Sequence, residues 1–293
     1  MQWDYTVNQS VNTSVFGFSW YLDALSKDWY GLITESYHHI MPVIFRPGKH
    51  RRVIDTTGIL SCHPIYSRSV LSKDVNTHFL LHLKKLASCL HISLDKMIQF
   101  YEYAKLPTYS TILFEIDLIT SYKRKRSQFD SRMISELEHW NKKDYRVRKI
   151  QDIKKATQKL YRSTLKFRAT HPFSKTQLCK LTNKMNDYHL VSVYGIFSPG
   201  GKCLATAMFI KSQNHFQLLG LSVSRFHKKP PLVAMIIDNF LRANSEKPLT
   251  LCLDNLVGPN ASKMLTAMGA KQVSQTIVKH GTRSWFQRIK QHD

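Results

Sequence analysis

The sequence predicts an α/β protein in which helices alternate with short strands. Hydrophobic residues make up 43% and aromatic residues 11% of the 293 residues, as in a globular protein. Hydrophobic side chains recur at helical spacing in some segments, as in Val233, Ile236 and Phe240. In other segments they alternate with polar ones, as in residues 112–118. Because both periods occur along the whole chain, we expect mixed sheets flanked by helices.

Residues 1–120 show both patterns and predict a first mixed α/β lobe. Ser93 precedes one of the predicted helices as its expected N-cap, and that helix carries Met97, Tyr101 and Ala104. The other predicted elements are a helix at 14–26, strands at 30–34 and 39–45, a helix whose apolar stripe runs from Val75 to Leu90, and a strand at 112–118.

Residues 121–172 are the most helical and most basic part of the chain, and we expect them to form a connector. One face of a predicted helix is basic and the other apolar; the basic residues are Lys155, Lys159, Arg162 and Lys166, opposite Ile153, Ala156 and Leu160. This stripe is either a solvated helix face or an anion-binding surface. The four consecutive cations from Lys123 to Arg126 form a denser candidate for binding nucleic acid or another anion.

Residues 173–293 predict a second lobe. Ser174 is the expected cap of its first helix, and the turn at 198–201 joins two strands as a hairpin. The predicted order is helix 174–187, strands 190–197, 202–210 and 216–223, a basic loop, a helix with an apolar stripe over 233–241, strand 249–253, a helix capped by Asn260 and ended by Gly269, and strands 272–279 and 284–289.

The charge of the chain favours anionic partners. It holds 43 Lys and Arg against 20 Asp and Glu, a formal net charge of +23. Such an excess concentrates nucleic acid, phosphorylated cofactors or acidic surfaces near the protein. The net charge alone does not show whether the cations bind such partners or only keep the protein in solution. Transfer RNA is therefore one of the candidate partners.

We expect a cytoplasmic protein without a membrane span or a metal. No apolar run reaches the roughly 20 residues that a spanning helix needs, and the first residues lack the pattern of a secretory signal. The cysteines include no Cys-x-x-Cys pair, which argues against a metal finger or a redox motif. We expect free thiols, most of them buried; the cysteines are Cys62, Cys89, Cys179, Cys203 and Cys252.

The element order of the second lobe resembles the GNAT superfamily of acyl-CoA-dependent transferases, over about residues 150–290. The stretch from Ser262 to Ala270 looks like the last helix of that family, which commonly finishes before a glycine. The N-terminal stretches 18–23 and 39–42, with Trp29 between them, resemble the opening of a two-lobed group akin to the Fem-type peptidyltransferases.

This resemblance implies two GNAT-like lobes, each a mixed, mainly antiparallel sheet flanked by helices. The implied domains are a degenerate GNAT-like lobe at 1–120, the basic helical connector at 121–172 and an acyl-donor-binding lobe at 173–293.

The resemblance also implies a site for acetyl-CoA or another acyl-CoA, in the loop before the helix at 233–241. Backbone N–H groups at a helix N-terminus favour the diphosphate of coenzyme A. The candidate binding residues are Ser224, Arg225, Phe226, His227, Lys228, Lys229 and Leu232. The loop lacks the family's Gly-x-Gly, and Pro230 and Pro231 have no N–H, so cationic side chains would have to replace backbone donors. The alternative is a basic surface loop without a cofactor.

Asp254 is the candidate general base. The related group often carries Asp-Phe-Glu-Gly-Ser after its fifth strand, and residues 252–256 align with that motif. Asp254 falls at the Glu position, where a carboxylate could take the proton of an amine. The alternative is that Asp254 caps a turn. Unlike many GNAT enzymes, the chain has no carboxylate in 216–223 and no Tyr in 260–269.

Together these features predict an acyl-CoA-dependent N-acyltransferase that acts on a small-molecule or peptide amine. One alternative is a Fem-type enzyme that takes an aminoacyl group from charged tRNA, which fits the basic charge. Another is a catalytically inactive GNAT-fold binding protein, which fits the missing glycines and the altered acidic motif.

Overall fold

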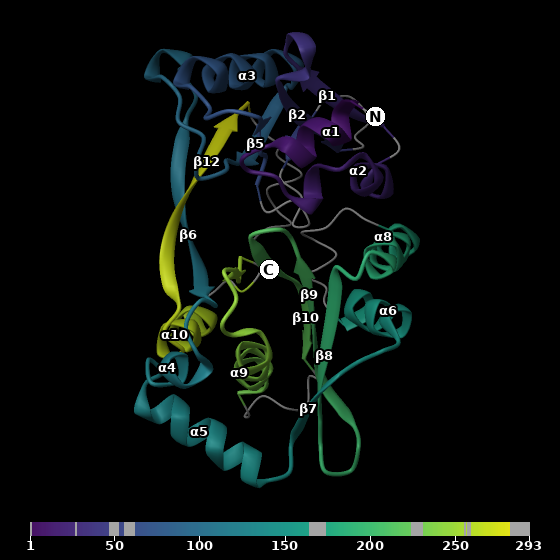
Figure 1. Cartoon of the computed structure of the whole chain (residues 1–293), viewed down its shortest axis with the longest axis vertical. Coiled ribbons are helices and arrows are strands. Elements are labelled where there is room, and N and C mark those ends of the chain that lie inside the picture. The colour runs from purple at the N-terminus through teal and green to yellow at the C-terminus, as the bar shows by residue number, and fades with distance from the viewer. Residues whose placement is uncertain are drawn as a thin grey trace. The chain divides into compact units, whose positions relative to one another are not determined.

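The computed structural model describes residues 2–26, 28–46, 53–55, 62–163, 174–223, 231–254, 256 and 259–281. By spatial contact the chain separates into two units, one of residues 1–111 with 274–293 and one of residues 112–273. Figure 1 shows the elements of both. The predicted domains, 1–120, 121–172 and 173–293, divide the chain by role and remain a proposal. The contact units differ from them by placing the end of the chain with the first unit.

The first unit contains a mixed, mainly antiparallel sheet. Its strands lie in the order β1, β2, β3, β5, β12, and β4 pairs with β2. All neighbours are antiparallel except β3 and β5, which are parallel. The bounds are β1 Trp29–Ile33, β2 His39–Arg46, β3 Val53–Asp55, β4 Tyr66–Ser67, β5 Cys89–Ser93 and β12 Lys271–His280.

The helices of the first unit are α1 Gln2–Gln9, α2 Ser19–Leu25 and α3 Lys73–Leu86. Helix α3 begins after Ser72, whose side chain accepts a hydrogen bond from the N–H of Val75. Its apolar face, with Phe79 and Leu83, packs into one core with Leu90 and Ile92 of β5. The predicted helix at 14–26 is a 3-10 turn, Val15–Gly17, followed by α2.

Two predictions in this unit were wrong. The stripe that begins at Val75 leaves the helix at Leu86, because Leu90 belongs to strand β5. The helix predicted after Ser93 is replaced by a turn and the short 3-10 helix Glu102–Ala104. In β5 the odd and even positions face opposite sides, and its backbone pairs with both β3 and β12. Backbone pairing with a strand on each edge therefore decides the structure of β5, although the local spacing of its apolar residues suggested a helix.

The second unit contains another mixed, mainly antiparallel sheet. Its strands lie in the order β6, β11, β10, β9, β8, β7. Here too one neighbouring pair, β10 and β11, is parallel and the others are antiparallel. The bounds are β6 Thr108–Asp117, β7 Arg146–Lys149, β8 Val191–Phe197, β9 Cys203–Lys211, β10 His215–Val223 and β11 Thr250–Cys252.

Helices cover both faces of the strands β8, β9 and β10. Helix α9 lies on one face, whereas α6 and α8 lie together on the other (Figure 1). Ser174 caps α8 in a reciprocal capping box with Gln177, as the sequence predicted. The bounds are α4 Tyr122–Arg126, α5 Ser131–Lys142, α6 Ile153–Ser163, α8 Lys175–Asp187, α9 Leu232–Asn244 and α10 Pro259–Ala267.

The apolar stripe of α9 anchors the core of this unit. Ile236, Phe240 and Leu241 are fully buried, and the ring of Phe240 stacks on Phe209 of β9 with centroids 4.1 Å apart. Each such side chain contributes about 1.5–3 kcal/mol by leaving water. The packing therefore fixes α9, and with it the start of α9, against the sheet.

Helix α10 begins two residues earlier than predicted, because a helix capped by Asn260 would begin at residue 261. Pro259 is its first residue, so Asn260 lies inside the helix and is not its cap. Proline suits this position because its missing N–H would have no partner there. Gly269 follows the helix with φ +70°, a left-handed conformation that glycine adopts readily, and ends it as predicted. The strand predicted at 284–289 lies outside the described residues.

The two units repeat one arrangement. In the first, β3 is followed by the short strand β4, then by α3 and β5, and in the second β10, α9 and β11 follow each other directly. In each case the two strands are parallel, and the second strand also pairs antiparallel with a strand from elsewhere in the chain. The repeat is one of topology, which explains why no repeat is visible in the residues themselves.

Candidate functional site

The parallel strands β10 and β11 pair over a short stretch only. His215 to Gln217 pair with Thr250 to Cys252, and we call this stretch the β10–β11 junction. Strand β11 ends there, while β10 continues to Val223. The register of β10 against β9 shifts between Leu218 and Gly220, which marks a β-bulge directly after the junction. Bulges of this kind re-aim a strand and are frequent beside active sites.

Helix α9 begins at Leu232, after β10 and the loop that follows it. Among the described residues no side chain caps this helix, and the first N–H that bonds back is that of Met235, to the carbonyl of Pro231. The first N–H groups of a helix have no partner inside it, and the helix dipole favours an anion there. Of the predicted donor-site residues, Leu232 is buried in the first turn of α9, whereas residues 224–229 lie outside the described residues.

A row of three polar side chains crosses the sheet at the junction. Gln217 of β10 is opposite Cys252 of β11, and Cys252 is opposite Glu115 of β6. Paired residues of neighbouring strands point to the same face, so the three share one side of the sheet. The thiol of Cys252 donates to Oε1 of Glu115 over 3.8 Å. We call Gln217, Cys252 and Glu115 the junction row.

The junction row faces away from α9. Phe216 and Leu218, which flank Gln217 in β10, belong to the core that contains α9. The ring of Phe216 lies 5.0 Å from that of Phe240. Because successive side chains of a strand alternate between its faces, Gln217 points to the opposite side, where α6 contacts β10.

Gln217 is the unusual member of the row. Its side chain is buried, with 1% of its surface exposed, yet neither Nε2 nor Oε1 has a hydrogen-bond partner among the described residues. A buried amide without partners costs about 1–3 kcal/mol. Native proteins retain such a cost rarely, and each instance needs an explanation. A ligand that bonds to the amide is one such explanation.

Asp254, the predicted base, lies two residues beyond β11. The N–H of Leu253 still bonds to the carbonyl of Phe114 over 3.0 Å, and the chain then turns as Leu256 bonds back to Leu253. Strands β10 and β11 are parallel, so their carboxyl ends meet at one edge of the sheet. Asp254 is half-buried and lies just beyond the last position at which β11 pairs with β10. Its role as base stays a prediction.

Sequence reasoning missed Gln217 and Glu115. Gln217 could have been found as a polar residue between the apolar residues Phe216 and Leu218 in the middle of a predicted strand. Glu115 alternates with buried apolar residues in β6, which is ordinary for a half-exposed strand. Its pairing with Cys252 is a contact between distant segments, and no local pattern announces it.

The dense basic cluster is not a free surface of four cations. Lys125 is buried and its Nζ lies 2.6 Å from Oδ1 of Asp117. Partial burial would raise the pKa of Asp117, but the hydrogen bond and charge of Lys125 outweigh it and lower that pKa. Arg126 contacts Glu138 at 3.2 Å. Lys123 and Arg124 are exposed, so the cluster was overestimated as an anion site.

The basic stripe of α6 has the two faces that the sequence predicted. Ile153, Ala156 and Leu160 are buried, whereas Lys155 and Arg162 are exposed. Lys159 is half-buried and donates to the carbonyl of Cys203 over 3.2 Å. Lys166 lies outside the described residues. All five cysteines are free, but Cys89 alone is buried, so the expectation of mostly buried thiols was wrong.

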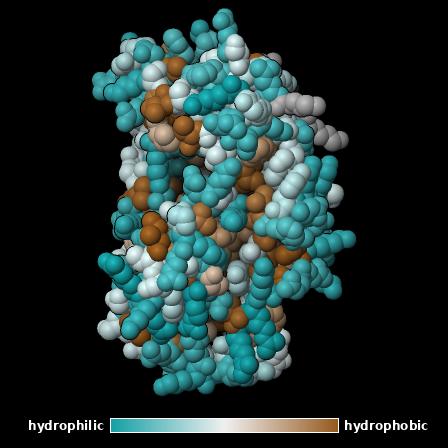
Figure 2. Space-filling model, in the orientation of Figure 1, coloured by the Kyte–Doolittle hydropathy of each residue, from teal (hydrophilic) through white to brown (hydrophobic). Residues whose placement is uncertain are grey.

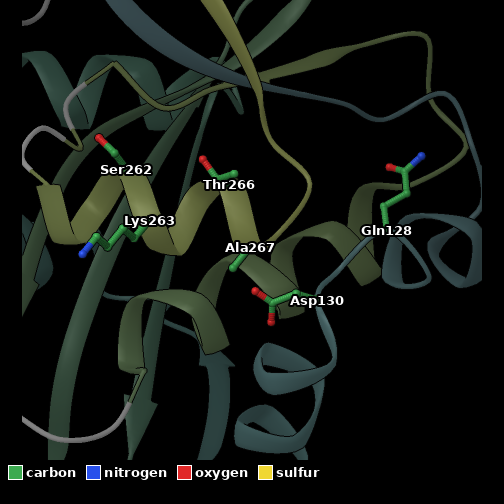
Figure 3. Close-up of a pocket in the computed structure, with 6 residues that line it drawn as sticks. All are labelled: Gln128, Asp130, Ser262, Lys263, Thr266 and Ala267. Carbon is green, nitrogen blue, oxygen red and sulfur yellow. The ribbon is translucent and has the colours of Figure 1, made fainter.

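A pocket of about 510 Å³ lies beside α10 and has no part in this site. Figure 3 shows the side chains that line it, which are Gln128, Asp130, Ser262, Lys263, Thr266 and Ala267. Asp130 serves as the N-cap of α5 and accepts from the N–H of Met133. Its own N–H bonds to the carbonyl of Ala267. These bonds are structural, and none of the predicted site residues lines the pocket.

In the part of the chain that the structure describes, no helix is both long and apolar enough to cross a bilayer. Over the same residues, no three His, Cys, Asp or Glu side chains are grouped so that they could hold a metal ion.

Comparison with solved structures identifies the fold. The chain superposes on FemX with a TM-score of 0.63 at 7% identity, covering 94% of each chain. It superposes on L-PGS from Bacillus licheniformis with a TM-score of 0.56 at 9% identity, covering 92% of this chain and 89% of that one. A tandem GNAT protein from the clavulanic acid biosynthesis pathway gives 0.52 at 10% identity, covering 86% and 81%.

These likenesses show the fold alone. The chain has a GNAT-like fold with Fem-like structural relatives, as the element order predicted. No protein-family model matches the sequence. No curated protein matches it either.

We predict that Gln217→Met raises the free energy of unfolding by about 1–3 kcal/mol, because methionine fills the same space without a buried polar group. Chemical denaturation measures the change. Gln275→Met is the matched control, since Gln275 is also buried but has a partner; we expect this variant to gain nothing. A loss of stability in Gln217→Met would show that the amide already has a polar partner in the free protein.

Proposed function

We propose that this chain is an acyltransferase that takes an acyl group from acyl-CoA and passes it to a small-molecule or peptide amine. The observation that carries the proposal is the short pairing of β10 with β11, which stops at Gln217 while β10 runs on to Val223. A gap between parallel strands leaves room for an extended ligand arm. The pantetheine arm of coenzyme A is such a ligand.

The start of α9 supports the same proposal. In the sequence, residues 224–229 lie between β10 and the first turn of α9 at Leu232, and we propose that this stretch and the helix start bind the diphosphate of the donor. Arg225, Lys228 and Lys229 supply positive side chains to this loop. Side-chain cations would compensate for the two N–H groups that Pro230 and Pro231 lack.

Asp254 is proposed as the general base of the transfer. It follows β11 at the edge where the gap between the strands opens, and it is half-buried. In the reaction the amine nitrogen attacks the thioester carbonyl, its proton passes to the carboxylate, and the thiolate of coenzyme A leaves. Glu115 of the junction row is the second carboxylate that could take this proton.

A second candidate is an enzyme of the Fem type, which takes an aminoacyl group from charged tRNA. The likeness to FemX over 94% of each chain favours it. Exposed cations on α6, among them Lys154, Lys155 and Arg162, would contact phosphates. Figure 2 shows mainly hydrophilic side chains over the lower part of the view, where Figure 1 places α5 of the same unit.

Coenzyme A is expected to raise the melting temperature. A ligand that binds only the native state at 100 times its Kd adds about 2.7 kcal/mol of stability. Pantetheine, which lacks the diphosphate, is the control ligand and should stabilise far less. Lys228→Ala with Lys229→Ala should reduce the shift, whereas Lys123→Ala with Arg124→Ala should leave it intact. No shift with coenzyme A would contradict the proposal, and a shift with tRNA alone would favour the second candidate.

Asp254→Asn is expected to lower kcat about 10²–10⁴-fold, the usual contribution of a general base, while KM for the acyl-CoA changes little. Steady-state kinetics with acetyl-CoA and a panel of primary amines measures both parameters. Glu115→Gln is the matched variant, and we expect a smaller loss in it. If Glu115→Gln loses activity and Asp254→Asn does not, the base is Glu115. Coenzyme A binding without transfer to any amine would point to the inactive binding protein.

A further inference from the structure

The first unit holds a chain of hydrogen bonds that the acyl-donor site does not use. Nδ1 of His91 lies 3.1 Å from Oδ1 of Asp55, and Nε2 of the same ring lies 2.7 Å from the hydroxyl of Tyr109. The rings of His91 and Tyr109 are nearly parallel, with an angle of 18° between them. Asp55 comes from β3, His91 from β5 and Tyr109 from the start of β6, which belongs to the first unit as far as Thr111.

The chemistry of the three groups fixes the direction of their hydrogen bonds. An ionised carboxylate only accepts, so Nδ1 of His91 carries the hydrogen and donates it to Asp55. In the neutral ring Nε2 is then an acceptor, and the hydroxyl of Tyr109 donates to it. Asp55 thus holds His91 in the tautomer that draws the proton away from the phenol. This is the arrangement of a proton relay.

Exposure increases along the relay. The side chain of Asp55 is 6% exposed and that of His91 is 31% exposed. Tyr109 is 48% exposed. The charged end is therefore buried and the hydroxyl end is accessible, as a group that exchanges protons with a ligand must be.

The relay occupies a position in the first unit that corresponds to the junction row in the second. Asp55 and His91 are partners across the parallel pair β3 and β5, just as Gln217 and Cys252 are across β10 and β11. His91 points away from the apolar core, because its neighbours Leu90 and Ile92 face that core. Both units therefore place polar groups at the one parallel pair of their sheet.

A cation lies beside the relay. Lys279 of β12 is the partner of His91 in the antiparallel pair, so both side chains lie on one face, and Lys279 is exposed. A positive charge here disfavours a bound ammonium relative to the neutral amine. This effect promotes the loss of a proton from a bound ammonium.

We infer that Asp55, His91 and Tyr109 form an acid–base site in the first unit that takes a proton from a primary amine. The ammonium nitrogen gives its proton to Oη of Tyr109, while the phenol's own proton passes to Nε2 of His91. The amine keeps the electron pair of the broken N–H bond as its lone pair. Asp55 stabilises the imidazolium that results, and His91 later returns the proton to water. The site shares no residue with the proposed acyl-donor site.

Proton affinity favours an amine over an alcohol as the ligand. The net acceptor of the relay is an imidazole, and a free imidazole such as histidine has a pKa of about 6.5, whereas an alkylammonium such as lysine has one of about 10.4. Transfer from the ammonium to the imidazole is therefore uphill by roughly 4 pKa units, and it is completed when the imidazolium gives its proton to water. An alcohol holds its proton far more tightly than either group.

The reactivity of Tyr109 tests the relay. An aryl sulfonyl fluoride, which labels phenols through their oxygen, should modify Tyr109 about 10²-fold faster than an ordinary exposed tyrosine, the lower end of general-base effects. Tyr103 is the internal control, since it is 61% exposed and stacks on Tyr101 rather than on an imidazole. Peptide mass spectrometry measures both rates in the full-length chain.

Two variants separate the relay from simple exposure. Asp55→Asn can donate to Nδ1 and so select the wrong tautomer, and His91→Phe keeps a ring under Tyr109 without a nitrogen. Both should lower the labelling of Tyr109 to the rate of Tyr103, with an unchanged circular dichroism spectrum. If Asp55→Asn fails to fold, His91→Phe carries the test. Equal rates for Tyr109 and Tyr103 in the unmodified chain, or no effect of His91→Phe, would overturn the relay.

The choice of ligand is tested with n-propylamine and n-propanol. In protein labelled with ¹³C at the tyrosine Cζ, the amine should shift the Tyr109 signal in a saturable way and leave the Tyr103 signal unchanged. Propanol at the same concentrations should shift neither signal. An equal response to both compounds, or no response to the amine, would contradict the assignment of a primary amine.

Discussion

The second unit depends on one constraint, which is that β10 and β11 are parallel strands that pair over three residues and no further. Parallel strands cannot be joined by a tight turn, so the chain must cross over through a helix, and α9 is that helix. Its apolar stripe, centred on Phe240, packs on β8 and β9 and holds the crossover in place. The start of α9, with Leu232 in the same core, is thereby fixed against the sheet. The proposed donor site follows from this geometry.

The same constraint explains where polar groups are buried. Gln217 lies at the last paired position of β10, with both polar atoms of its side chain unpartnered in the described structure. In the first unit, Asp55 and His91 occupy the corresponding parallel pair and bond to each other. Burial of such groups is costly, and both units accept the cost at the equivalent position. We therefore regard the parallel pairs as the places where this fold carries chemistry.

Local patterns predicted most elements of the second lobe because capping and periodicity are properties of neighbouring residues. The Ser174 cap, the hairpin around 198–201 and the stripe of α9 are all of this kind. Patterns failed where pairing between distant strands decides the structure, as in β5, which local spacing assigned to helices. The junction row was invisible for the same reason, since Glu115 and Cys252 are 137 positions apart. The roles of Asp254 and of the loop before α9 remain predictions.

The central claim is that the gap beyond the junction and the first turn of α9 together receive a diphosphate-bearing thioester donor. Amide hydrogen exchange with and without coenzyme A tests it most directly, since it reports on individual N–H groups. We predict slower exchange at Leu232 to Ala234 and along Gly220 to Val223, with no change in α5. Equal exchange at these amides in the presence of saturating coenzyme A would contradict the claim.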